Sequence, residues 1–185
     1  MAKKKPTTSS ENEESLEIEK YLWTDIKEGD HYAKKPEQYY DHLFEQYKMF
    51  VEMADRISAR RSNANVFFLT INSSIITFIS FYIKEIKKID EPEFLIFPFI
   101  GVLMICLVWS AIIQSYKSLN SGKFQVIRLM SAKLPATPYQ AEWIALGEGN
   151  DKRKYFPLTQ IEQWVPAIFA FLYIVLFTYS KIKGG

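Results

Sequence analysis

Apolar residues fill three long blocks of the sequence, and polar and charged residues fill the segments between them. The blocks run from Val66 to Ile83, from Phe94 to Ile113 and from Trp164 to Tyr179, and charged residues are absent from all three. At a rise of about 1.5 Å per residue, each block would span roughly 24 to 30 Å as a helix, which is close to the thickness of a hydrocarbon core. The pattern therefore predicts three membrane-spanning helices.

A second pattern precedes the first block. Apolar and aromatic residues alternate there at spacings of three and four, which is the a/d repeat of a helix that packs along a narrow seam. The seam residues are Tyr40, Leu43, Tyr47, Phe50, Ala54 and Ile57. No Gly or Pro interrupts residues 37–83, so we predict one helix of up to about 45 residues that continues into the first span. The seam packs either within one subunit, against the helix of the second loop, or between subunits.

Weaker signals mark other helices. Ile18, Leu22 and Ile26 recur every four residues and predict a short helix from about residue 10 to residue 28. Pro98 lies inside the second apolar block, where it predicts a kink or an offset helix start. The helical pattern continues past this block, and we expect residues 120–122, Asn-Ser-Gly, to interrupt it.

Two capping boxes are expected in the last third of the chain. Thr137 with Gln140 predicts the start of a short helix that ends near Gly147. Thr159 with Glu162 predicts the start of the third span.

These patterns predict an all-α integral membrane protein with three transmembrane helices and long cytoplasmic helical extensions. The predicted segments, in order, are a disordered basic tail (1–10), cytoplasmic helices with the seam (11–62), a first span (63–84), a short external loop (85–92), a second span (93–114), a cytoplasmic helical region (115–158), a third span (159–180) and an external tail (181–185).

Basic residues near the span ends predict the orientation, because Lys and Arg are retained on the cytoplasmic side. They precede the first span, follow the second and precede the third, at Arg56, Arg60, Arg61, Lys117, Lys123, Arg128, Lys152, Arg153 and Lys154. We therefore expect the N-terminus and the long second loop to be cytoplasmic and the C-terminus to be external.

The first apolar block contains many hydroxyl groups for a helix in lipid. On a helical wheel, Thr70, Ser73, Ser74, Thr77 and Ser80 lie within about 120° of one another, and Asn72 lies off this stripe. We call these five residues the hydroxyl stripe. Small hydroxylated side chains allow close helix packing with hydrogen bonds between helices. Alternatively, copies of the helix surround an axis and the hydroxyls line a wet path. The absence of charge inside the block favours packing over a pore.

Composition argues against several function classes. The net charge of +2 gives no reason to expect nucleic-acid binding. The single cysteine, Cys106, excludes an intramolecular disulfide. His31 and His42 do not form a metal site, and the glycines at 147 and 149 lack the rest of a phosphate loop. We expect no metal, no cofactor, no catalytic residue and no enzyme activity.

Two stretches combine the features of one known family. The first, EQYYDHLFEQYKMFVEMADRISARRSNANVFFLTINSSI, contains Asp55, Arg56, Arg60, Arg61 and Asn65. The second, LPATPYQAEWIALGEGNDKRKYFPLTQIEQWVPAIFAFLYI, contains Glu142, Trp143, the turn at 147–149, Tyr155, Thr159, Glu162 and Pro166. Over roughly residues 36–179 the chain resembles the RipA family of octameric bacterial membrane proteins.

The resemblance implies a bacterial cytoplasmic (inner) membrane protein that assembles as an octameric ring, with a role in adaptation to growth inside host cells. In such a ring, Arg56, Arg60 and Arg61 would form a basic collar at the cytoplasmic surface. In a single subunit, the same arginines anchor the helix end. The layout is also similar to the SLATT group of helical membrane effectors, proposed to permeabilise membranes in bacterial conflict systems, although those typically have two spans.

Taken together, the sequence favours a non-enzymatic homo-oligomer whose cytoplasmic helices act as an assembly or partner-docking platform, in stress, host adaptation or defence. The alternative is a gated ion-conducting or membrane-permeabilising pore. The expected partners are other copies of the chain, membrane lipid and a cytoplasmic protein, and nucleic acid is not expected.

Overall fold

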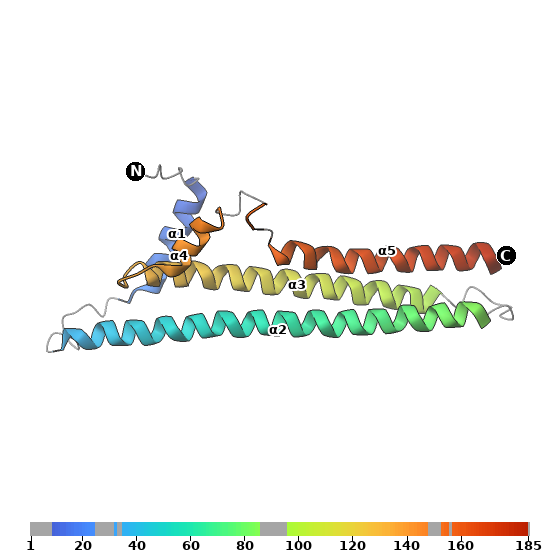
Figure 1. Cartoon of the computed structure of the whole chain (residues 1–185), viewed down its shortest axis with the longest axis horizontal. Helices are drawn as coiled ribbons and strands as arrows, with labels where there is room; N and C mark the ends of the chain where they lie inside the picture. Colours follow the sequence, from blue (N-terminus) through green and yellow to red (C-terminus); the bar gives the residue numbers. More distant parts are fainter. Residues whose placement is uncertain are drawn as a thin grey trace. The chain divides into compact units, whose positions relative to one another are not determined.

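Five α-helices contain most of the residues that the computed structural model describes, which are 9–24, 32, 35–85, 96–147, 153–155 and 157–184. The helices are α1 (Ser9–Leu22), α2 (Pro36–Glu85), α3 (Ile96–Ser131), α4 (Pro138–Ala145) and α5 (Leu158–Gly184) (Figure 1). No strand occurs within these ranges. The predicted all-α fold class is confirmed.

Some predicted segments lie outside the described residues. These are most of the basic tail at 1–10, nearly all of the external loop at 85–92, residues 148 and 149 of the glycine turn, and the end of the external tail. The boundaries predicted between cytoplasmic and spanning segments stay predictions.

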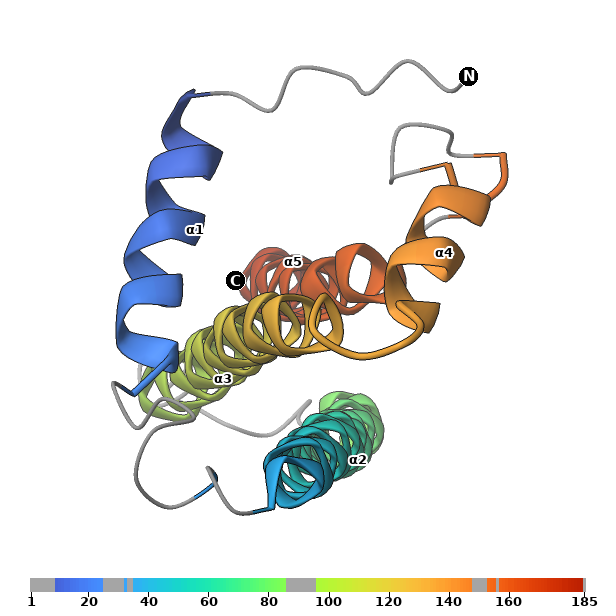
Figure 2. The ribbon, with the colours of Figure 1, turned by 90° about the vertical axis from the view of Figure 1, so that its left-hand side faces the viewer.

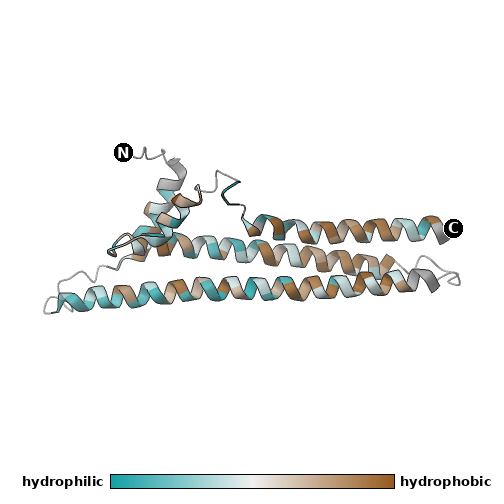
Figure 3. Cartoon of the chain, in the orientation of Figure 1, coloured by the Kyte–Doolittle hydropathy of each residue, from teal (hydrophilic) through white to brown (hydrophobic). Residues whose placement is uncertain are grey.

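Helix α2 is one continuous helix of 50 residues, as predicted from the uninterrupted sequence. Pro36 occupies its first turn, where the missing backbone N–H is not needed. Figure 3 shows mainly hydrophilic residues along the first half of α2 and mainly hydrophobic residues along the second half. The same helix therefore combines a polar segment with a segment suited to lipid.

Helix α3 differs from one expectation. It runs without interruption through Asn120 and Gly122, so the predicted break is wrong. A single glycine inside a helix costs only about 1 kcal/mol. Burial of Ile127 and Met130 in the following turns, at 0% and 2% exposure, offsets that cost. Pro98 lies in the first turn of α3 and produces no break in the helix that follows, while residues 86–95 lie outside the described part, so the offset start stays a prediction.

The two expected capping boxes are also wrong. Helix α4 follows Thr137, but the Thr137 side chain makes no capping hydrogen bond, because its ψ of 67° departs from the extended conformation of a typical N-cap. Helix α5 begins at Leu158, so Thr159 lies inside the helix, and the Pro157 carbonyl accepts the hydrogen bond from the Gln160 N–H. The predicted end of α4 is confirmed, since Gly147 follows it with a φ of 77°.

The chain forms two units, each compact by itself. The first contains Met1–Arg56 and Asn120–Glu148, and the second contains Ile57–Leu119 and Gly149–Gly185. In the second unit, α2, α3 and α5 lie side by side (Figures 1 and 2). Three helices, α2, α3 and α5, are long and apolar enough to cross a membrane. The prediction of three membrane-spanning helices agrees with this arrangement.

Candidate functional site

The hydroxyl stripe of α2 lies on the outer surface of the second unit. All five of its residues are exposed. Three hydroxyls donate to backbone carbonyls one turn earlier: Ser74 to Thr70 at 2.8 Å, Thr77 to Ser73 at 2.8 Å and Ser80 to Ile76 at 2.7 Å. Such bonds satisfy the hydroxyl donors without a partner from another helix. The stripe is therefore not used for packing within the chain.

Asn72, the residue off the stripe, is the centre of a buried polar cluster in the second unit. It is 0% exposed. The Tyr173 hydroxyl of α5 donates to its side-chain oxygen at 3.0 Å, and the Cys106 thiol of α3 lies 3.6 Å from the same oxygen. The Asn72 amide nitrogen donates to the Phe68 carbonyl at 2.8 Å. One asparagine thus connects all three helices.

Apolar side chains surround this polar cluster. Val102, Cys106 and Tyr173 form the buried core, and α2 packs against it through Ile75, Ile76 and Ile79. On the α2 wheel these residues lie on the side of Asn72, roughly opposite the hydroxyl stripe. The core therefore determines which side of α2 faces its own chain.

Further polar contacts connect the helices toward the start of α5. The Trp109 indole N–H donates to the Asn65 side-chain oxygen at 3.0 Å, and the Gln163 amide donates to Gln114 at 2.7 Å. The Trp109 ring also stacks on Phe68, with centroids 5.7 Å apart. These contacts join α2 to α3 and α3 to α5.

The Glu162 carboxylate has a different role from the one predicted. Instead of capping α5, it forms an ion pair with Arg61 of α2, with Nε and Oε2 3.3 Å apart and both side chains 15% exposed. The contact lacks hydrogen-bond geometry at these two atoms. Helix α5 begins at Leu158, so Glu162 lies one turn inside it.

Sequence reasoning missed this inner polar side of α2, although a signal was present. Arg61, Asn65 and Asn72 share one side of the helical wheel, as the hydroxyl stripe shares the other. Asparagine has few reasons to occur in a lipid-exposed position. Its separation from the stripe indicated a second polar surface.

The arginines of the predicted basic collar are not equivalent. Arg56 lies 3.3 Å from Glu52 on the surface, Arg60 is exposed, and Arg61 is the partner of Glu162. The exposed pair contributes little to stability, since such pairs are worth about 0 to 1 kcal/mol. The collar itself stays a prediction, because it requires several copies of the chain.

The seam residues are largely covered by their own chain. In the first unit, Leu43 and Ala54 are 4% and 3% exposed, and Lys123 of α3 lies over the Phe50 ring at 5.1 Å from its centroid. Ile57, in the second unit, is also buried, whereas Tyr40 is exposed. This burial favours packing within one subunit for the central seam residues.

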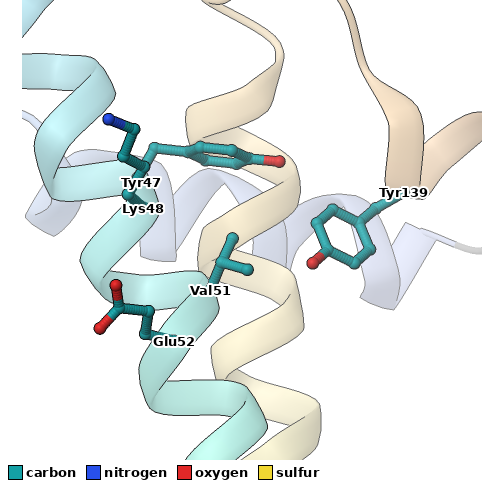
Figure 4. Close-up of a pocket in the computed structure, with 5 residues that line it drawn as sticks. All are labelled: Tyr47, Lys48, Val51, Glu52 and Tyr139. Carbon is teal, nitrogen blue, oxygen red and sulfur yellow. The ribbon is translucent and has the colours of Figure 1, made fainter.

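A shallow cleft of about 280 Å³ lies in the first unit between α2 and α4 (Figure 4). Tyr47, Lys48, Val51, Glu52 and Tyr139 line it. Burial, and secondarily the neighbouring Tyr139, raises the pKa of Tyr47 above its usual value, so the phenol is neutral at physiological pH. The Lys48 ammonium lies 2.8 Å from Glu45 and 4.4 Å from the Phe44 ring centroid. The cleft therefore presents two phenols beside charges that already have partners.

Helix α4 contains two of the residues singled out by the resemblance. Glu142 and Trp143 are exposed, and none of the residues of α4 is buried. Of the other residues in that group, Pro166 is buried inside α5, Tyr155 is 37% exposed, and the side chain of Thr159 lies outside the described part. Glu142 and Trp143 belong to the first unit and the others to the second, so a joint role for this group stays a prediction.

Comparison with known proteins adds one match. The model of the octameric membrane protein family (8xMP) matches residues 44–182 of the 185-residue chain. The matched range begins in α2 and ends in α5, so it includes the apolar parts of all three candidate spans. No curated protein and no solved structure matches the chain.

Proposed function

Because the chain belongs to the octameric membrane protein family, we propose that eight copies form a ring in a bacterial inner membrane and that the first unit of each serves as a docking platform. The platform is non-enzymatic and lies on the cytoplasmic side. Its task is to hold a protein partner at the membrane surface.

The exposed surface of α4 is the observation that supports a platform. Trp143 and Ile144 are 46% and 55% exposed, and α4 contains no buried residue. Burying a large apolar side chain gains about 1.5 to 3 kcal/mol. Clustered apolar side chains that are left exposed typically mark interaction sites. A second protein that covers α4 would gain this free energy.

Charge supports the cytoplasmic position proposed for the first unit. Lys117, Lys123 and Arg128 follow the apolar part of α3, and Arg60 precedes that of α2. Retention of these cations on the cytoplasmic side supports a cytoplasmic position for α1 and α4 as well.

Crosslinking in growing cells tests the platform. A photoreactive residue at position 143 is expected to crosslink to a protein other than the chain, while the same residue at exposed Met49 of α2 is the control. Crosslinks from position 143 only to lipid or to other copies would contradict the proposal.

The second candidate function is a gated pore, and the exposed hydroxyl stripe is the observation that favours it. In a ring whose axis faces α2, these hydroxyls would line a wet path. Ion flux through liposomes containing the purified protein, measured together with its mass in detergent, separates the two functions. A platform is expected to show eight times the 21.7 kDa chain mass and no flux. Flux that Ser73→Leu and Thr77→Leu reduce in an intact assembly would favour the pore.

A further inference from the structure

We propose that the hydroxyl stripe of α2 is the surface through which neighbouring copies contact each other inside the bilayer. The inference rests on the octamer proposed above and assigns its contact surface. The occupant of the stripe is a second copy of this chain.

The first argument is coverage by the chain itself. Only 6% of the apolar window of α2 is buried within the chain, compared with 22% for α3 and 17% for α5. The side of α2 that is covered bears Asn65, Asn72 and Ile76, which contact α3 and α5. The stripe lies roughly opposite that side. Helix α2 therefore has the smallest share of buried residues of the three spans.

The second argument is a difference between exposed surfaces. The exposed side chains in the apolar parts of α3 and α5 are mostly large and apolar, including Phe97, Ile100, Met104, Leu107, Ile168, Phe171, Leu172 and Val175. Such surfaces suit lipid tails. The exposed side of α2 instead contains five small hydroxylated residues beside the large apolar residues Val66, Phe67, Leu69, Phe78 and Phe81. If all three surfaces faced lipid, selection for lipid contact would not produce this difference.

The third argument concerns the hydroxyl groups. Ser74, Thr77 and Ser80 donate their protons to carbonyls of α2 itself. Water is therefore not needed to satisfy these donors. Small side chains whose donors are already satisfied let another helix approach closely, and small residues are typical of helix contacts in membranes.

The symmetry of a ring indicates how the copies meet. Neighbours in a closed ring use two different patches of each copy, so the stripe of one subunit contacts a different surface of the next. The family match provides the occupant, since an octamer places a copy beside every subunit. Lipid and water are the alternative occupants.

Site-directed spin labelling tests the inference in reconstituted membranes. In a Cys106→Ser background, single cysteines replace Ser73 or Thr77 in the stripe. Leu107→Cys on α3 and Ile168→Cys on α5 are matched controls, because those side chains are 63% and 54% exposed. The rate at which each spin label collides with a paramagnetic reagent is then measured. The two reagents are oxygen, which enters lipid, and a nickel complex, which stays in water. The mass of the unlabelled protein and of each labelled variant is measured in parallel.

Labels at positions 73 and 77 are expected to collide with both reagents several-fold less often than the more accessible control. High oxygen collision at the stripe would show lipid contact, and high nickel collision would show an aqueous path; either overturns the inference while the octamer stands. An unlabelled protein without octamer mass would overturn the proposed function itself.

If labels at the stripe prevent assembly and those at 107 and 168 do not, Ser73→Ala is expected to keep the octamer and Ser73→Trp to dissociate it. Assembly of Ser73→Trp would contradict the contact.

Discussion

Asn72 shows how one polar residue can organise three apolar helices. Its side-chain oxygen accepts from Tyr173 and lies near the Cys106 thiol, and its nitrogen donates to Phe68. Each polar atom of the side chain therefore has a partner in a region without water. Unpaired polar groups are costly in such surroundings, which makes this arrangement specific for one packing of the helices.

Replacing Asn72 by Leu is expected to lower the free energy of unfolding by about 1 kcal/mol, because hydrogen bonds between membrane helices contribute about 0.6 to 2 kcal/mol. Tyr173→Phe removes the donor of the hydrogen bond to Asn72. The double variant should therefore lose less stability than the sum of the losses in the two single variants. Unfolding by SDS titration, followed by circular dichroism, measures all three. Strict additivity would show that the bond contributes nothing.

The ion pair of Arg61 and Glu162 gives a second prediction at this scale. Glu162→Gln leaves the partly buried guanidinium without its anion and is expected to cost about 1 to 3 kcal/mol. The exchanged pair, Arg61→Glu with Glu162→Arg, should recover part of that loss in the same titration. An exchanged pair as unstable as the worse single variant would argue against direct pairing.

At the scale of elements, α2 is a helix with two polar sides. One side pairs with α3 and α5 through amides and a guanidinium, while the other presents hydroxyls bonded to its own backbone. Amides and charges need partners from other helices in lipid, whereas serine and threonine can satisfy themselves. This difference explains why the side with the amides and the guanidinium packs against α3 and α5.

Gly122, in the interior of α3, gives a prediction about the stability of a whole helix. A Cβ added at Gly122 would meet nothing within 4 Å, so Gly122→Ala changes helix propensity without a clash. It is expected to stabilise the protein by about 0.5 to 1 kcal/mol in the SDS titration. Gly122→Pro is the opposing control and is expected to lower the free energy of unfolding by about 3 kcal/mol. Destabilisation by alanine would mean that another copy occupies this space in the assembly.

For the whole molecule, three candidate spans and the distribution of cations predict the membrane topology. With three spans, the two ends of the chain lie on opposite sides of the membrane. The positive-inside bias predicts that the N-terminus is the cytoplasmic end. The cytoplasmic platform depends on this orientation.

A reporter active only in the periplasm, fused after Gly185, is expected to be active because the predicted orientation puts the C-terminus outside. The same reporter fused at the N-terminus should be silent. Activity of the N-terminal fusion with a silent C-terminal fusion would invert the topology and exclude a cytoplasmic partner for α4.

The sequence by itself determined the helices, because their signals are local. Apolar length predicts each span, and freedom from Gly and Pro predicts the continuity of α2. Tertiary structure decided which groups become partners, since that depends on residues far apart in the chain. Glu162 could equally have capped α5, and it pairs with Arg61 because packing brings α2 alongside. Asn72 meets Tyr173 across 101 positions, a proximity that no local pattern contains.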